Sequence, residues 1–260
     1  MATFVFLISF GALTLYLTSI TSLYLLPLWA VISYGLAFLT VLLIYMLNFP
    51  LVLILPGKHP YKAYLMKSMA RLLNRFILGL KVEVIGINHI PVSGPLVVYA
   101  NHKSYTDGFS LLDFFPRPLT FAPKKSVLSI PLLKGWLRAY DVFPVNRSNP
   151  RETAKDLDRA VETVKNGHAL LIFPEGQIKN RLKAEVEAMK PGAFKVALRA
   201  EANILIVRLD GNDLVRHRFP WKRSYRKLTI LEPIAYEIYK DMTTQELAKF
   251  VMDKINFKDY

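Results

Sequence analysis

The first charged side chain in this sequence is Lys58, and the 57 residues before it contain no Asp, Glu, Lys or Arg. All 34 Lys+Arg and all 20 Asp+Glu follow, so the formal net charge of +14 belongs to the rest of the chain. An ordinary soluble globular protein scatters its charges along its length, and this distribution argues against that class. With 52% hydrophobic residues, wholesale disorder is excluded too. We therefore expect an apolar segment, residues 1–57, joined to a basic domain, residues 58–260.

The apolar segment is too long for a signal peptide, which has a positive start and an apolar run of about 7–15 residues. Its two stretches, Thr3–Leu26 and Val31–Phe49, each match the roughly 20 apolar residues with which a helix crosses a bilayer. Helix is the expected form, because lipid offers backbone polar groups no partners. We predict a membrane-associated helical hairpin with its turn near Pro27–Trp29, either spanning the bilayer or dipping into one leaflet.

Basic residues follow this segment at once, and positive charge beside a membrane segment marks the cytoplasmic side: Lys58, Lys62, Lys67, Arg71 and Arg75. Apolar residues recur every three or four positions from Tyr61 to Leu80, which predicts an amphipathic helix. This helix either packs on its own domain with a solvated basic face or touches anionic headgroups, and the two interpretations are compatible.

Beyond residue 80 the chain alternates strand-like and helix-like runs. The predicted strands are Val82–Ile87, Leu96–Tyr99, Leu119–Ala122, Val142–Val145, Ala169–Phe173, Ile204–Leu209 and Lys227–Ile230. The predicted helices are Tyr105–Phe115, Ile130–Ala139, Arg151–Lys165, Ala193–Ala200 and Gln245–Ile255, the last with Thr243 or Thr244 as its N-cap. Continuous apolar strands such as ALLIF favour a sheet buried on both faces. The pattern predicts an α/β domain with a mixed, largely buried sheet flanked by helices.

The motif NHKSYTD (residues 101–107) directly follows the predicted strand LVVYA. A His with an Asp five residues later can act as a general base with an orienting carboxylate. On an ideal helix the two would lie about 140° apart, so they meet only if His102 lies in the turn and Asp107 in the first helical turn. The alternative is a capping box, Ser104-x-x-Asp107, in which Asp107 only starts the helix.

Two further motifs follow predicted strands. FPEG (173–176) would place Glu175 at the carboxyl end of the sheet, where α/β proteins bind ligands, unless it is an ordinary turn with a solvated Glu. FPVNR (143–147) puts Arg147 at another strand end, and arginine suits bidentate phosphate recognition, although a surface arginine is the simpler interpretation.

The ordered set NHKSYTD, FPVNR and FPEG resembles the lysophosphatidic acid acyltransferase family of membrane glycerolipid acyltransferases. The linking segments PKKSVLSIPLLKGWL and MKPGAFKVAL are similar to that family as well, and the resemblance covers roughly Val82 to Leu209. An apolar N-terminal helical element is also usual in this family.

The resemblance implies direct acyl transfer from acyl-CoA or acyl-carrier protein to the secondary hydroxyl of lysophosphatidic acid, which gives phosphatidic acid. His102 would be the base and Asp107 its orienting carboxylate. The implied acceptor-binding residues are Arg147, Glu175, Gly176 and Lys124. No metal or redox cofactor is implied, in keeping with a sequence that contains no cysteine.

The sequence departs from the family after FPEG, where Gln177-Ile178 stands in place of a Ser/Thr-Arg pair. Either Lys179 or Arg181 then replaces the family's arginine, or the acceptor headgroup differs. The segment ILIVRLDG also lacks the proline of the family's fourth motif. Alternative acceptors are therefore another lyso-lipid, such as a lyso-ornithine lipid, or glycerol 3-phosphate.

Two other functional classes compete. A basic protein can bind nucleic acid, but no recognition motif of that kind is present, and we expect membrane lipids rather than nucleic acid as partners. A non-catalytic membrane-surface binding protein would keep the basic face and tolerate the loss of His102.

Overall fold

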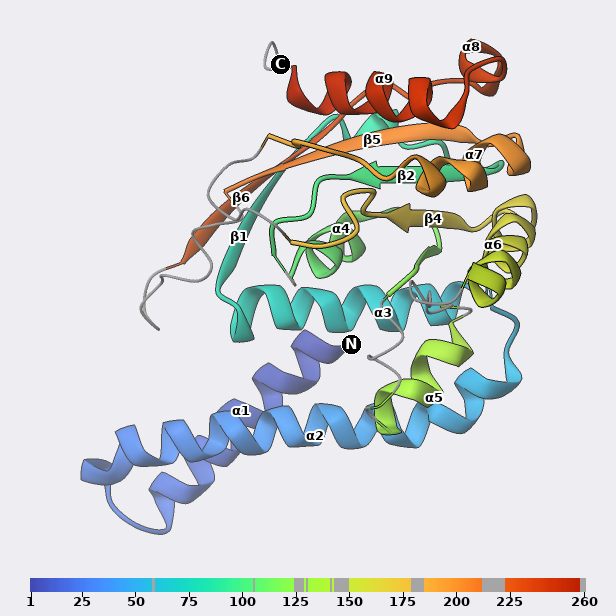
Figure 1. The fold of residues 1–260 in the computed structure, drawn as a ribbon. Coiled ribbons are helices and arrows are strands. Elements are labelled where there is room, and N and C mark those ends of the chain that lie inside the picture. Colours follow the sequence, from blue (N-terminus) through green and yellow to red (C-terminus); the bar gives the residue numbers. More distant parts are fainter. Residues whose placement is uncertain are drawn as a thin grey trace.

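The computed structural model describes residues 1–57, 59–104, 106–123, 129, 131–140, 142, 150–178, 185–211 and 223–257. Two apolar helices open the chain, α1 (Ala2–Ser19) and α2 (Leu26–Ile54), joined through the short 3-10 helix η1 (Leu23–Leu25). They pack along each other as a hairpin (Figure 1). Both are long and apolar enough to cross a membrane. The predicted pair of N-terminal apolar helices is confirmed.

The turn of this hairpin lies earlier than the sequence predicts. It falls at residues 20–25, and Pro27 lies at the first positions of α2. Proline suits that place, because the first helical turn has no intrahelical acceptor for its missing N–H. Pro50 lies inside α2, which continues to Ile54. Neither Pro27 nor Pro50 therefore lies in the turn of the hairpin.

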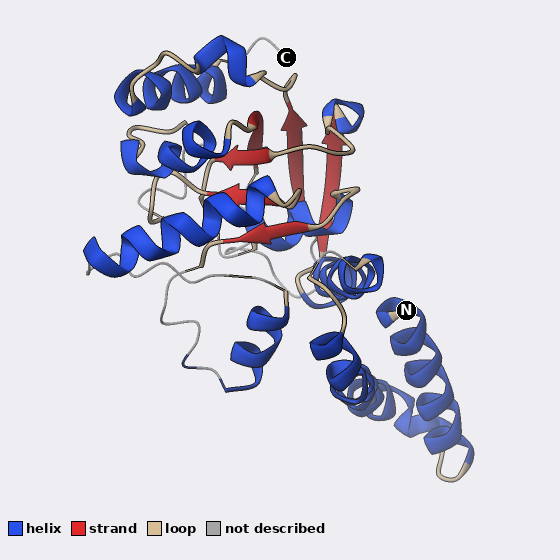
Figure 2. Ribbon diagram, turned by 90° about the vertical axis from the view of Figure 1, so that its right-hand side faces the viewer, coloured by secondary structure: helices blue, strands red, loops and turns tan. Residues whose placement is uncertain are grey.

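In the described residues, six strands form one mixed sheet, whose strands Figure 2 draws as arrows; their order is β1-β6-β5-β2-β4-β3. Their bounds are β1 Leu80–Ile85, β2 Leu96–Ala100, β3 Leu119–Phe121, β4 Ala169–Ile172, β5 Asn203–Asp210 and β6 Ser224–Ile230. β5, β2, β4 and β3 are parallel, while β6 runs antiparallel to β5 and parallel to β1. The carboxyl ends of the four parallel strands therefore share one edge.

Helices cover both faces of the sheet, so it is buried as predicted. Val97 and Tyr99 of β2 pack with residues of α6 (Pro150–Lys165), α7 (Lys195–Ala200) and α9 (Thr244–Asn256). Leu96 and Val98 point the other way, into a cluster with residues of α4 (Asp107–Phe114). The 3-10 helix η5 (Pro191–Phe194) precedes α7, η3 (Ile87–His89) follows β1, and α8 (Tyr236–Tyr239) precedes α9. Thr243 caps α9 through a capping box with Glu246.

The helix α3 (Pro60–Leu72) lies between the hairpin and the sheet domain (Figure 1). It ends earlier than the predicted Leu80, because a π-helical turn, η2 (Leu73–Ile77), follows it. Gly79 then takes a left-handed φ of 57°, and Leu80 begins β1. The apolar spacing continues through residues that have left the helix.

Contacts on two sides hold α3 in this place. The Tyr45 hydroxyl of α2 donates a hydrogen bond to the carbonyl oxygen of Leu65, at 2.8 Å. On the other side, Arg71 Nε lies 2.8 Å from Asp113 Oδ1 of α4. Part of the basic face of α3 therefore packs on the protein's own domain, as the first of the two sequence interpretations states. This face is not wholly solvated, because Arg71 pairs with Asp113.

The helix α5 (Pro131–Ala139) packs on α2. The Trp136 ring lies 5.2 Å from the Phe49 ring and 5.8 Å from the Tyr45 ring of α2. Of the strand predicted at Val142–Val145, Val142 belongs to no strand, and the other three residues lie outside the described residues.

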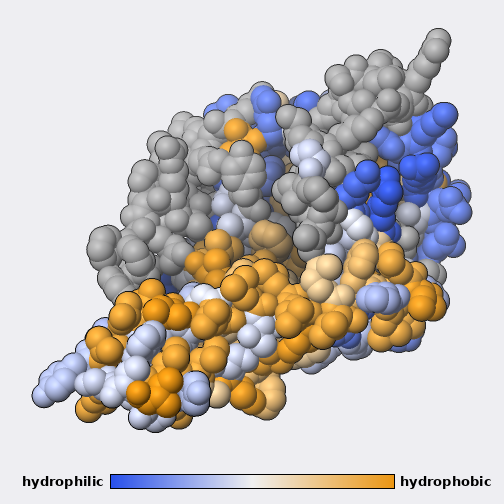
Figure 3. Space-filling view, turned by 90° about the horizontal axis from the view of Figure 1, so that it is seen from below, coloured by the Kyte–Doolittle hydropathy of each residue, from blue (hydrophilic) through white to orange (hydrophobic). Residues whose placement is uncertain are grey.

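Apolar side chains cover the outer surface of the hairpin (Figure 3). Leu15, Leu47 and Ile54 are 72%, 72% and 81% exposed. Exposed apolar surface of this extent is typical of membrane or protein contact and is unlike the rest of the molecule.

Candidate active site

Asn101 fixes the turn that follows β2. Its side-chain amide is fully buried, donating through Nδ2 to the Leu209 carbonyl oxygen at 2.8 Å and accepting from the Leu209 N–H at 2.7 Å. Leu209 lies near the carboxyl end of β5, the neighbour of β2. The next residue, His102, is thus held at the carboxyl edge of the parallel strands.

The structure brings His102 and Asp107 together. His102 Nδ1 lies 3.1 Å from Asp107 Oδ2, with the His in the turn and the Asp at the first position of α4. The same oxygen accepts hydrogen bonds from the main-chain N–H groups of Lys103 at 2.8 Å and Ser104 at 2.9 Å. Asp107 therefore holds the turn before α4 and contacts the imidazole at once. The capping box with Ser104 as N-cap is not formed, because the N-cap of α4 is Thr106 and it makes no side-chain cap hydrogen bond.

The imidazole of His102 has one occupied and one available nitrogen. Because Nδ1 faces a carboxylate, it is the nitrogen that carries the proton in the neutral ring, and Nε2 is left as the acceptor. The ring stacks on Phe173, with centroids 4.2 Å apart and planes 21° apart, and the side chain is 20% exposed. This arrangement fixes the orientation of a partly exposed ring, in which Nε2 has no hydrogen-bond partner among the described residues.

Glu175 reaches the same turn from the segment after β4. It is buried, which contradicts the interpretation as a solvated turn residue. Its Oε1 accepts from the main-chain N–H of His102 at 2.6 Å, and its Oε2 lies 3.0 Å from Lys103 Nζ. Lys103 Nζ also donates to the Glu185 carbonyl oxygen at 3.1 Å. Both carboxylate oxygens of Glu175 thus support the turn that carries His102.

Gly176 makes this approach of Glu175 possible. Its φ is +77°, a left-handed conformation that only glycine adopts without strain. A Cβ at this position would lie 2.7 Å from Cε of Lys190. Any larger residue would therefore disturb the turn that brings Glu175 to His102.

A buried arginine completes the surroundings of Asp107. Arg226 of β6 places Nη1 3.2 Å from Asp107 Oδ1 and 2.8 Å from the Ser110 hydroxyl of α4. Both side chains of the ion pair are fully buried. Burial lowers the pKa of the Arg226 guanidinium, and the neighbouring Asp107 opposes that shift. Asp107 consequently lies between a titratable imidazole and a buried cation.

Four of the predicted substrate-binding residues, Lys124, Arg147, Lys179 and Arg181, lie outside the described residues. Their roles stay predictions. In contrast, the structure gathers His102, Asp107, Glu175 and Gly176 at one edge of the sheet.

Sequence reasoning missed several residues of this site, namely Asn101, Lys103, Phe173 and Arg226. Asn101, Lys103 and Phe173 lie inside the motifs NHKSYTD and FPEG, in which only the His, Asp, Glu and Gly were predicted as site residues. Arg226 had a signal of its own: it shares the alternating pattern of Ser224, Leu228 and Ile230, all of which are buried. A period-2 pattern places residues of one parity on one face, so Arg226 could have been expected inside.

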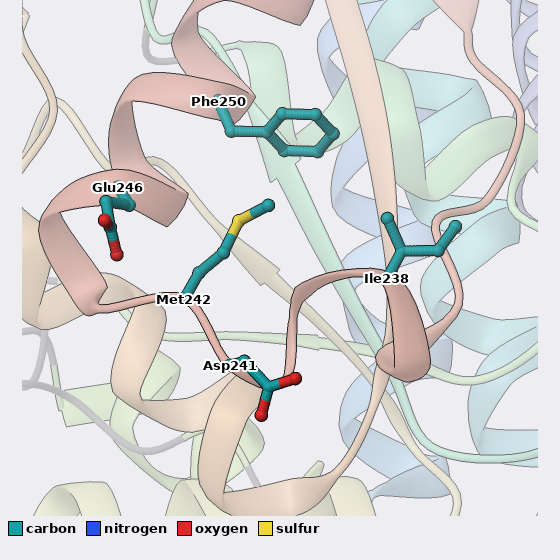
Figure 4. Close-up of a pocket in the computed structure, with 5 residues that line it drawn as sticks. All are labelled: Ile238, Asp241, Met242, Glu246 and Phe250. Carbon is teal, nitrogen blue, oxygen red and sulfur yellow. The ribbon is translucent and has the colours of Figure 1, made fainter.

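Two hollows in the described part of the chain lie away from His102. One, with a cavity volume of about 440 Å³, is an open depression between α8 and α9, lined by Ile238, Asp241, Met242, Glu246 and Phe250 (Figure 4). The other, of about 400 Å³, lies between the start of α3 and the end of α4 and includes Tyr64, Lys67 and Phe115. Within the same described ranges, no three His, Asp or Glu side chains cluster as a metal site would require.

Comparison with known proteins places this site in a family. Residues 81–209 match the family described as Acyltransferase. This part of the chain belongs to the Acyltransferase family. The matched stretch contains His102, Asp107 and Glu175 and ends just before β6, so Arg226 lies beyond it.

Several relatives carry related names. The chain is 31% identical over 185 residues to a 1-acyl-sn-glycerol-3-phosphate acyltransferase of Saccharomyces cerevisiae, covering 70% of this chain and 60% of that protein. It is 32% identical over 152 residues to a probable 1-acyl-sn-glycerol-3-phosphate acyltransferase of Mycoplasma pneumoniae, covering 56% of each. The chain thus spans less than two thirds of these relatives.

A solved structure shares the fold. The crystal structure of the 1-acyl-sn-glycerophosphate (LPA) acyltransferase from Thermotoga maritima matches with a TM-score of 0.62 and 24% identity. The match covers 75% of this chain and 78% of that one. At this identity the likeness establishes the architecture of the acyltransferase domain.

Proposed function

We propose that this protein is a membrane-bound acyltransferase that moves a fatty acyl group from acyl-CoA or an acyl-carrier protein to the secondary hydroxyl of lysophosphatidic acid, giving phosphatidic acid. The observation that carries the proposal is the pairing of His102 with Asp107 at the carboxyl edge of the sheet, 3.1 Å apart, inside the matched family segment. The names of the relatives from S. cerevisiae and M. pneumoniae support the choice of substrate.

In this mechanism His102 Nε2 accepts the proton of the acceptor hydroxyl while that oxygen attacks the carbonyl carbon of the thioester. The carbon–sulfur bond breaks when the tetrahedral intermediate collapses, and the imidazolium returns its proton to the leaving thiolate. Asp107 holds the Nδ1–H and stabilises the imidazolium. Both products then leave without a covalent enzyme intermediate.

The acceptor phosphate needs cationic partners, because a buried or half-buried phosphate must be paired. We assign this role to Arg147, Lys124, Lys179 and Arg181, in line with the motif positions. Glu175 and Gly176 contribute differently: Glu175 already accepts from the main chain of His102 and pairs with Lys103, so it supports the acceptor site through the catalytic turn.

An assay of the purified full chain in detergent tests the reaction. Lysophosphatidic acid, a lyso-ornithine lipid and glycerol 3-phosphate are each offered with acyl-CoA and with acyl-carrier protein. We expect lysophosphatidic acid to be the best acceptor. If it were the poorest, the proposed substrate would be wrong.

The His102→Ala variant tests the mechanism. We expect acyl transfer to be abolished while folding and membrane association persist. The matched control is His89→Ala, because His89 lies beyond the end of β1 and pairs with Glu232 at 3.0 Å, away from the site. Unchanged turnover in His102→Ala would contradict the role of His102 as the base, whereas membrane binding without acyl transfer by the wild-type protein would favour a non-catalytic binding protein.

We further propose that the hairpin of α1 and α2 lies in the membrane with the acyltransferase domain on the cytoplasmic face. The exposed apolar surface of the hairpin and the basic residues after it support this assignment. Because the chain has no cysteine, Tyr24→Cys gives a single labelling site at the tip of the hairpin, where Tyr24 is 96% exposed. Labelling by an impermeant reagent from outside would indicate a spanning hairpin; protection would indicate insertion into one leaflet.

A further inference from the structure

Asp107 is a buried anion with two different neighbours. Oδ2 receives the two main-chain N–H groups and faces the imidazole of His102. Oδ1 accepts no hydrogen bond within the described chain, yet it lies 3.2 Å from Nη1 of Arg226. The carboxylate therefore faces an imidazole through one oxygen and a guanidinium, which has no acceptor atom, through the other.

Arg226 is buried at a considerable cost in desolvation. Its side chain has no exposed surface, and within the described chain Nε and Nη2 have no hydrogen-bond partner. A fully buried cation of this kind is expected where it compensates a specific anion, since an apolar residue would otherwise be the more stable choice. In the described part of the chain, Asp107 is the carboxylate within ion-pair distance of it.

We propose that Arg226 is a positioning residue of the His102–Asp107 pair: it compensates the charge of Asp107, so that the carboxylate orients the imidazole without binding its protonated form too strongly for the ring to act as a base. Arg226 lies outside the matched family segment, which ends at residue 209, before β6 begins. The proposal rests on the proposed role of His102 as the base.

The other charges around His102 do not replace Arg226. Lys103, from the same turn, and Glu175, from the segment after β4, pair with each other at 3.0 Å and cancel. Asp107 of α4 and Arg226 of β6 form the second pair. Among the side chains that the structure describes here, removal of the arginine alone leaves Asp107 without its cation, which stabilises the imidazolium and removes the base at higher pH than before.

The test is the pH dependence of kcat/KM for Arg226→Gln and Arg226→Lys, with an acceptor-free blank subtracted. For Arg226→Gln we expect the acid limb to move to higher pH by about one unit, with a rate close to that of the wild type at alkaline pH. The reason is that a missing cation several ångströms away favours the protonated ring. Arg226→Lys keeps the charge, and its acid limb should stay near that of the wild type.

Ser110→Ala provides a milder variant, in which we expect the acid limb to move in the opposite direction. The Ser110 hydroxyl accepts from Nη1 of Arg226, and without this acceptor the planar guanidinium can shift as a whole toward Asp107 Oδ1. Stronger compensation of Asp107 should move the acid limb to lower pH by roughly half a unit. Alanine suits the helix interior, so this variant decides the question if Arg226→Gln does not fold.

Arg117→Met is the matched control for loss of a buried guanidinium. Burial lowers the pKa of Arg117 as it does that of Arg226, but Arg117 donates to the carbonyl oxygens of Pro91, Gly94 and Gly167 at the opposite edge of the sheet. We expect it to lose stability without moving the acid limb.

The outcomes separate the two proposals. A rate that falls by the same factor at every pH in Arg226→Gln, or an unmoved acid limb in Ser110→Ala, would show that Arg226 only supports the fold. Activity retained in His102→Ala would instead contradict the role of His102 as the base, and absence of acyl transfer by the wild-type protein would contradict the proposed function, whatever the Arg226 variants do.

Discussion

Two carboxylates reach His102 from different parts of the fold, Asp107 from the first turn of α4 and Glu175 from the segment after β4. Each has a buried cation of its own, Arg226 and Lys103 respectively. They differ in what they touch, because Asp107 contacts the imidazole and Glu175 contacts the main chain. The difference teaches that orienting the imidazole ring and holding its backbone are separate tasks, which separate ion pairs perform in this fold.

The Asp107→Asn variant tests the contact of Asp107 with the imidazole, and we expect it to have the largest effect. An amide in place of the carboxylate no longer stabilises the imidazolium and permits the wrong tautomer of His102. We expect kcat to fall by about three to four orders of magnitude, measured with lysophosphatidic acid at saturating donor. A loss of less than tenfold would contradict the assignment of Asp107 to the ring.

Glu175→Gln addresses the second carboxylate. Gln can still accept from the His102 N–H, but Lys103 is left as an unpaired buried cation. We expect the free energy of unfolding in detergent to fall by about 3–5 kcal/mol, with a smaller loss of kcat per folded molecule than in Asp107→Asn.

The double variant Lys103→Met, Glu175→Gln tests whether the loss of stability in Glu175→Gln comes from the unpaired charge of Lys103. With both charges removed, part of the lost stability should return, since the cost comes from an unpaired charge. Strictly additive losses in the double variant would show that the two side chains do not act as a pair.

Phe173→Leu should have the smallest effect, because it removes a stacking contact and no charge. Aromatic pairs contribute about 0.5–1.5 kcal/mol, so we expect a roughly three- to tenfold lower kcat/KM with an unchanged pH profile. The control is Phe194→Leu, in which the ring that packs against Tyr99, with centroids 4.4 Å apart, is lost from the opposite face of the sheet. That variant should lower stability and leave the activity of folded molecules intact.

The sequence predicted the parts of this site that are close together along the chain. His102 and Asp107 are five residues apart, and helix geometry alone required the turn-and-helix arrangement that the structure has. The apolar strands and the buried sheet could also be predicted from the sequence, because continuous apolar runs such as ALLIF are typical of strands that are buried on both faces.

The remaining features depend on contacts between distant residues. The burial of Glu175 follows from its pairing with Lys103, and nothing in FPEG indicates that partner. Alternation in SYRKLTI places Arg226 inside, but its pairing with Asp107 requires the position of β6 between β1 and β5. The turn of the hairpin was misplaced for a local reason, since proline suits a helix start as well as a turn.

The place of α3 between the hairpin and α4 has a mechanical consequence. Its contacts with Tyr45 on one side and Asp113 on the other make it a spacer one helix thick, about 8–10 Å from axis to axis. A hairpin seated in a bilayer would therefore hold the His102 turn at a set height above the lipid. A lipid acceptor would have to rise by a matching distance, with its headgroup leaving the plane of its neighbours, before its hydroxyl could meet the imidazole.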